Sequence, residues 1–154
     1  MMKTPDNTAA HILLHDSKQI HVLLVDDDEA LLRLFGGYLQ AAGFEVLYAH
    51  DGNEGRETAR RLQPDVILLD LTLPIMDGYE VISRLKAEKP TKHIPIIVLT
   101  SADMSQDSER LLKQEGVADY IHKSVQDKEL VGRIKKILTS RGYVIRDVLQ
   151  RNTV

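Results

Sequence analysis

Short apolar runs that alternate with helix-like segments limit most strongly how this chain can fold. The runs are rich in β-branched residues and cover residues 20–25, 44–49, 66–69, 94–99 and 120–121. Runs of this length between polar segments are typical of β-strands. Because the runs are almost continuously apolar, they predict strands that are buried on both faces of a sheet.

Amphipathic segments lie between these runs. The clearest covers residues 31–42, where apolar residues recur with the period of an α-helix and Gly43 supplies a stop signal. Weaker helical patterns cover residues 54–62, 81–85, 111–112 and 130–138. Strand followed by helix, five times over, predicts an α/β fold with a doubly wound, five-stranded parallel sheet and helices on both faces.

The alternating region also predicts the domain organisation. A chain of 154 residues suits one domain. We expect that domain over residues 20–140, an N-terminal extension over residues 1–19 and a C-terminal tail over residues 141–154.

Composition excludes several functions. Lys and Arg total 20 against 23 Asp and Glu, and this balance argues against direct binding of nucleic acid. The chain has no cysteine, which excludes disulfides, a thiol nucleophile and cysteine metal sites. No apolar run approaches the roughly 18 residues of a membrane span, and no signal peptide is recognisable. These features predict a cytoplasmic protein without a membrane partner.

Acidic residues follow two of the expected strands. Asp26, Asp27 and Asp28 come directly after the first strand, and Asp70 ends the third. Open α/β sheets bind ligands at this edge. Neighbouring buried carboxylates repel one another, and Mg²⁺ is a cation that can offset their charge. Helix capping would explain Asp28, but it would not explain the convergence of Asp26 and Asp27 with Asp70.

At this point the chain resembles the receiver domain of two-component response regulators, over roughly residues 20–140. Four motifs carry the resemblance, in order VDDD at 25–28, DVILLDLTLPIMDG at 65–78, IPIIVLTSA at 94–102 and ADYIHK at 118–123. The resemblance implies a flavodoxin-like strand order of 2-1-3-4-5. It also implies a signalling phosphoacceptor that is not an enzyme in the usual sense.

The resemblance assigns roles to individual residues. Asp70 is expected to accept the phosphoryl group, as the nucleophile that forms an acyl phosphate. Asp26, Asp27, Asp70 and the backbone carbonyl of Thr72 are expected to hold Mg²⁺, which would offset charge on the transferring group. Lys123 is expected to contact a phosphoryl oxygen as a point charge.

A switch is also implied. Thr100 is expected to donate a hydrogen bond to the phosphoryl group and to move inward, and Tyr120 is expected to fill the space that Thr100 leaves. This movement would change the surface of the fourth helix, fifth strand and fifth helix. The same surface resembles one through which receivers form homodimers.

One residue departs from the family pattern. Ser124 follows Lys123, where receivers commonly have a proline with a cis peptide bond. Since a cis bond before a residue other than proline costs roughly 2.5–4 kcal/mol, we expect a trans bond here. His122 also adjoins Lys123, but strand alternation is expected to direct its side chain to the opposite side.

The expected partners are a sensor histidine kinase or histidine phosphotransfer protein as donor, and a downstream protein or effector domain as target. Two alternatives stay open. The chain could be a receiver-like module that binds partners without phosphorylation. More remotely, it could be an aspartyl-phosphate phosphatase of the haloacid dehalogenase type, although those enzymes place a second Asp where this chain has Thr72.

Overall fold

The computed structural model describes residues 19–145. In it, five strands and five helices alternate along the chain. The strands are β1 (His21–Val25), β2 (Glu45–Ala49), β3 (Val66–Asp70), β4 (Ile96–Thr100) and β5 (Asp119–His122). The helices are α2 (Glu29–Ala41), α3 (Gly52–Leu62), α4 (Gly78–Ala87), α5 (Gln106–Gln114) and α6 (Asp127–Ser140).

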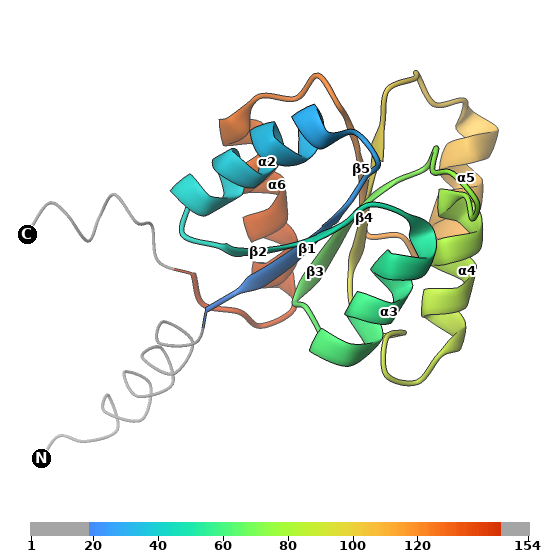
Figure 1. Cartoon of the computed structure of the whole chain (residues 1–154), viewed down its shortest axis with the longest axis horizontal. Helices are drawn as coiled ribbons and strands as arrows, with labels where there is room; N and C mark the ends of the chain where they lie inside the picture. Colours follow the sequence, from blue (N-terminus) through green and yellow to red (C-terminus); the bar gives the residue numbers. More distant parts are fainter. Residues whose placement is uncertain (1–18, 146–154) are drawn as a thin grey trace, which may run out of the picture.

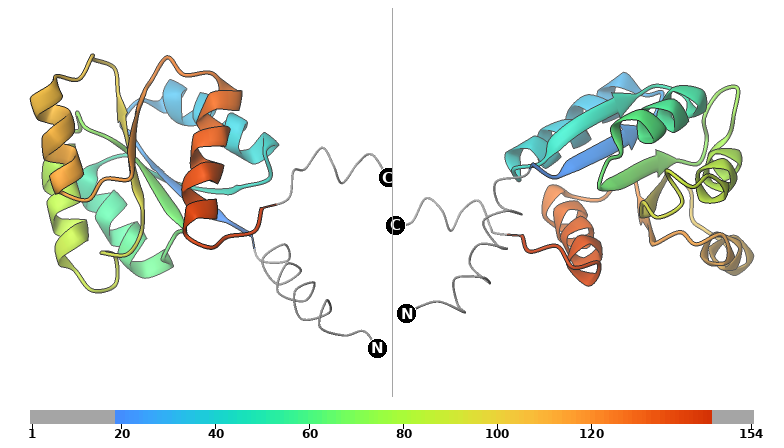
Figure 2. Two further views of the ribbon diagram at one scale, coloured as in Figure 1. Left: turned by 180° about the vertical axis from the view of Figure 1, so that it is seen from behind. Right: turned by 90° about the horizontal axis from the view of Figure 1, so that it is seen from below.

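All strands run parallel in one sheet of order β2-β1-β3-β4-β5, so the predicted fold class and strand order are confirmed. Helices α2 and α6 cover one face of the sheet, and α3, α4 and α5 cover the other (Figures 1 and 2). Each face has its own apolar core. The residues of β3 and β4 are buried throughout, as the continuous apolar runs predict.

The first helix accommodates its two glycines in different ways. A Cβ atom at Gly36 would clash with the Tyr48 hydroxyl of β2, whereas a Cβ atom at Gly37 would meet nothing within 4 Å. Close packing therefore explains Gly36 but not Gly37. Gly43 follows the helix with a φ of 95°, which supports its expected role in ending α2.

Part of the segment that we assigned to a C-terminal tail packs against the domain. Tyr143 and Ile145 contact the apolar core beneath α2 and α6. The Tyr143 hydroxyl also donates a hydrogen bond of 2.5 Å to Asp65, at the beginning of β3. The remainder of the tail and the N-terminal extension up to residue 18 lie outside the described residues, and the domain boundaries stay predictions.

Candidate functional site

The two buried carboxylates lie side by side at the carboxyl edge of the sheet. Strands β1 and β3 pair with Val25 opposite Leu69, so Asp26 and Asp70 follow at neighbouring positions. Their exposed fractions are 0% and 3%. Asp27 is exposed, yet all three carboxylates have oxygens within 4.8 Å of one another. The fold thus brings the three predicted ligand side chains to one place.

Lys123 reaches the same place from the end of β5. Its Nζ lies 2.9 Å from Oδ2 of Asp26 and 3.2 Å from Oδ1 of Asp70, with 18% of the side chain exposed. Despite this contact, Oδ2 of Asp26 is a buried oxygen that accepts no well-directed hydrogen bond from residues 19–145. A buried oxygen whose one close donor is poorly directed, beside two other carboxylates, fits coordination of a hard divalent cation.

Burial and charge change the pKa of both Asp70 and Lys123. The pKa of Asp70 is raised, mainly by burial and further by the nearby Asp26 charge, although Thr72 and Lys123 act in the opposite direction. Burial lowers the pKa of Lys123, but the hydrogen bonds and charges of Asp26 and Asp70 outweigh it, so the net shift is upward. Lys123 is therefore a cation, and Asp70 is a carboxylate that a further cation would stabilise.

The loop after β3 holds the Asp70 carboxylate. The Thr72 N–H donates a hydrogen bond of 3.1 Å to Asp70 Oδ1. Gly78 lets the chain return close to the strand, because a Cβ atom there would lie 2.6 Å from the Asp70 carbonyl oxygen. Between them, Ile75 is 88% exposed and has a φ of 69°, a strained conformation for a β-branched residue. The role of the Thr72 carbonyl as a metal ligand stays a prediction.

Thr100 and Tyr120 line one groove of about 450 Å³. The groove lies among α5, β5 and α6, the fourth helix, fifth strand and fifth helix of the sequence-based prediction. Thr100 exchanges hydrogen bonds with the backbone of Ala102, at 3.1 and 3.2 Å. Hydrogen bonding to Glu109 of α5 raises the pKa of Tyr120. The predicted switch pair therefore shares a surface, and its movement stays a prediction.

The turn after β5 confirms one prediction and adds a residue. Residues 19–145 contain no cis peptide bond, so the Lys123–Ser124 bond is trans, as expected. His122 was given no role in the sequence analysis. Its Nδ1 nevertheless lies 3.1 Å from the Ser124 nitrogen and 2.7 Å from the Ser124 hydroxyl. A hydrogen-bond acceptor at a strand end, two residues before Ser124, is the sequence signal that could have revealed this contact.

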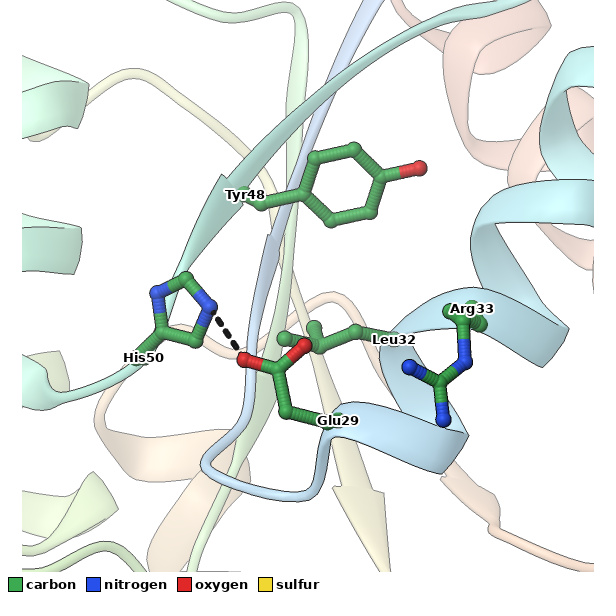
Figure 3. Close-up of a pocket in the computed structure, with 5 residues that line it drawn as sticks. All are labelled: Glu29, Leu32, Arg33, Tyr48 and His50. Carbon is green, nitrogen blue, oxygen red and sulfur yellow. Dashed lines mark ion pairs between the residues drawn. The ribbon is translucent and has the colours of Figure 1, made fainter.

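A second hollow, of about 270 Å³, lies between β2 and the first turns of α2. Its wall includes the ring of Tyr48, and His50 Nε2 lies 2.7 Å from Glu29 Oε1 (Figure 3). None of the residues predicted to act in phosphoryl transfer lines this hollow. The carboxylate cluster is therefore the better candidate for a reactive centre.

Comparison with known families supports this choice. The family model of the response regulator receiver domain matches residues 22–135. The chain belongs to this family. Receiver domains are signalling phosphoacceptors that interact with histidine kinases and downstream effectors. The match spans both β1 and β3, which supply the clustered carboxylates, and β5, which precedes Lys123.

Individual relatives differ in how much of their length this receiver domain matches. Over 117 residues it is 38% identical to the DNA-binding dual master transcriptional regulator RpaA of Synechocystis, covering 76% of this chain but 48% of RpaA. It is 36% identical to the polar-differentiation response regulator DivK of Brucella ovis, covering 76% of this chain and 94% of DivK. The chain thus spans about half of one relative and nearly all of the other.

A solved receiver domain bears on the metal. The receiver domain of a sensor histidine kinase from Pseudomonas aeruginosa was solved with a magnesium ion coordinated in its active-site cleft. Its TM-score to this structure is 0.69 with 31% sequence identity, covering 80% of this chain and 97% of that one. No helix among residues 19–145 of the present chain is long and apolar enough to cross a membrane.

Proposed function

We propose that this receiver domain is a phosphoacceptor that takes a phosphoryl group on Asp70 from a phosphohistidine. The observation that carries the proposal is the buried Asp70 carboxylate, flanked by Asp26 and held 3.2 Å from the Lys123 ammonium. The donor is a sensor histidine kinase or a histidine phosphotransfer protein, in keeping with the family.

The chemistry follows from the contacts of Asp70. The Thr72 N–H and the Lys123 ammonium both contact Oδ1 of Asp70. Within residues 19–145, no hydrogen bond or ion pair reaches Oδ2 of Asp70. One carboxylate oxygen forms a bond to phosphorus while the bond from phosphorus to the donor imidazole nitrogen breaks. The electron pair of that bond stays on the nitrogen, which then takes up a proton. Asp70 becomes an acyl phosphate.

The surrounding residues orient and neutralise the groups that react. Lys123 balances negative charge as it develops on a phosphoryl oxygen, and its position between Asp26 and Asp70 fits that role. Asp26, Asp27 and Asp70, with the Thr72 carbonyl, would hold Mg²⁺. When bound, this ion would supply positive charge that keeps Asp70 ionised and stabilises the transferring oxygens. Phosphoryl transfer depends mainly on such positioning and electrostatics.

The output of the switch is a change in the groove lined by Thr100 and Tyr120. Thr100 is 8% exposed, and among residues 19–145 its hydroxyl hydrogen-bonds only to Ala102, so the hydroxyl can turn to a phosphoryl oxygen at the cost of two local hydrogen bonds. Tyr120 then follows, and α5, β5 and α6 present a different surface to a downstream protein or to a second copy of the chain.

Incubation of the protein with acetyl phosphate and Mg²⁺, followed by intact mass spectrometry, tests the proposal. We expect the chain to gain the mass of one phosphoryl group, and this gain should require Mg²⁺. Absence of any gain would favour a module that binds partners without phosphorylation. Mass measurement in solution with beryllofluoride, a phosphoryl mimic, tests whether the switched form dimerises.

A further inference from the structure

Four strand ends around the candidate site have the same type of hydrogen bond. At each end, the acceptor is the last side chain of the strand or the side chain directly after it. It accepts a hydrogen bond from the backbone N–H of the residue two positions further on. The pairs are Asp26 with Asp28 at 2.9 Å, Asp70 with Thr72 at 3.1 Å, Thr100 with Ala102 at 3.2 Å and His122 with Ser124 at 3.1 Å. The first three acceptors already belong to the proposed site, and His122 is the fourth.

Hydrogen bonds hold the backbone on both sides of Lys123, and His122 takes part in those that follow Lys123. Before it, the Lys123 N–H donates to the Thr100 carbonyl at 2.7 Å. After it, the Val125 N–H donates to the His122 carbonyl at 3.0 Å and closes a turn. The Ser124 N–H and hydroxyl both lie within hydrogen-bond distance of Nδ1 of His122. The turn that carries Lys123 is therefore held by two backbone hydrogen bonds and by the His122 imidazole.

Nδ1 of His122 acts as the acceptor in this contact. A backbone N–H can only donate, so Nδ1 must offer its lone pair to Ser124. A side chain without an acceptor at position 122 would leave the Ser124 N–H without this partner. Lys123 has a long flexible side chain, and a fixed backbone favours the position of its ammonium between Asp26 and Asp70.

We propose that His122 is a positioning residue, whose imidazole nitrogen Nδ1 helps to fix the turn after β5 and so holds Lys123 against the phosphoacceptor. The inference rests on the proposed function of Asp70 and Lys123. It assigns to His122 an action through Lys123, without contact with the phosphoryl group.

The test measures the initial rate of phosphorylation by acetyl phosphate with Mg²⁺. His122→Ala should lower the rate by about fivefold or more, the factor that corresponds to a lost hydrogen bond of ordinary net strength. His122→Asn should restore most of the rate, because its side-chain oxygen can accept the Ser124 N–H. His93→Ala, at an exposed histidine outside the groove, should leave the rate unchanged.

Rescue by the conservative variant separates positioning from a general loss of structure. A His122→Ala variant as fast as wild type would overturn the proposal. So would a His122→Asn variant as slow as His122→Ala, because its side-chain oxygen restores the acceptor for the Ser124 N–H.

A measurement on the unphosphorylated protein distinguishes failure of this inference from failure of the proposed function. If wild type gains no phosphoryl group, the function of Asp70 fails, but NMR signals of the Lys123 side chain still test the positioning. We expect these signals to shift in His122→Ala and to return toward wild type in His122→Asn. Unchanged Lys123 signals in His122→Ala would contradict the inference.

Discussion

Strand β3 has an aspartate near each end, and the two aspartates differ in how their charge is compensated. Asp65, directly before the strand, accepts hydrogen bonds from the His21 N–H at 2.8 Å and the Tyr143 hydroxyl at 2.5 Å. Asp70, at the other end, accepts one hydrogen bond from the Thr72 N–H and shares the Lys123 ammonium with the neighbouring Asp26 carboxylate. One carboxylate is held by two hydrogen-bond donors of its own, and the other lies in a carboxylate cluster whose charge one ammonium offsets only in part.

The difference separates structural from chemical use of the same side chain. The contacts of Asp65 connect β1, β3 and the segment after α6. Burial raises the pKa of Tyr143, and its hydrogen bond to Asp65 raises it further. The environment of Asp70 raises the pKa of the carboxyl group itself, mainly through burial. Proteins seldom leave buried charge incompletely paired unless the site binds or reacts.

The largest expected effect is a difference in reactivity between the two aspartates. Asp70→Asn should abolish the gain of phosphoryl mass from acetyl phosphate, because the amide is not a nucleophile. Asp65→Asn should retain the gain, since Asp65 lies at the opposite edge of the sheet. Intact mass spectrometry of both variants measures this. Equal gains in both would contradict the assignment of Asp70.

The next effect concerns the cation. Asp27→Asn should weaken Mg²⁺ binding by at least about tenfold, because it removes a charged ligand. Mg²⁺ stabilises a folded protein that binds it by about 2.7 kcal/mol at a concentration of 100 Kd. Thermal unfolding in a Mg²⁺ titration measures the shift in midpoint. Glu115→Gln, at an exposed acid after α5, serves as control and should titrate like wild type.

A smaller effect is expected at the Asp65 end. Tyr143→Phe should lower the free energy of unfolding by about 1–2 kcal/mol, because it removes a donor from a partly buried carboxylate. It should leave the rate of phosphorylation unchanged. Urea unfolding and the acetyl phosphate assay measure the two quantities. A loss of phosphorylation with unchanged stability would mean that the two ends of β3 are coupled.

The smallest effect is the pH dependence of stability. A carboxyl group whose pKa is raised in the folded state binds its proton more tightly there than in the unfolded chain. Ionisation of this carboxyl group therefore lowers the free energy of unfolding at pH values above its folded-state pKa. This loss shrinks as the pH falls below that pKa. Without Mg²⁺, Asp70→Asn should be more stable than wild type at neutral pH, and the difference should shrink on acidification. An increasing difference in urea unfolding would contradict the raised pKa of Asp70.

Local patterns predicted the parts of the molecule that depend on neighbouring residues. The apolar runs gave the five strands because burial on both faces leaves a direct mark on sequence. Asp26 and Asp70 could be expected to meet because parallel strands that are adjacent end at the same edge. The trans bond before Ser124 followed from the cost of the alternative.

Contacts between distant residues could not be predicted in the same way. Asp65 and Tyr143 lie 78 positions apart, and nothing in either local segment indicates that the hydroxyl returns to the first end of β3. His122 was dismissed because strand alternation directs it away from Lys123. Its effect on Lys123 instead passes through the backbone of Ser124, which alternation does not describe. The strained conformation of Ile75 likewise has no sequence signal.

The most direct test of the central claim locates the phosphoryl group. Borohydride reduces an aspartyl phosphate to homoserine, which peptide mass spectrometry can assign to a position. After treatment with acetyl phosphate and Mg²⁺, we expect homoserine at position 70 in wild type and none in Asp70→Asn. Homoserine at position 26 or 27, or its absence from the wild-type chain, would contradict the account.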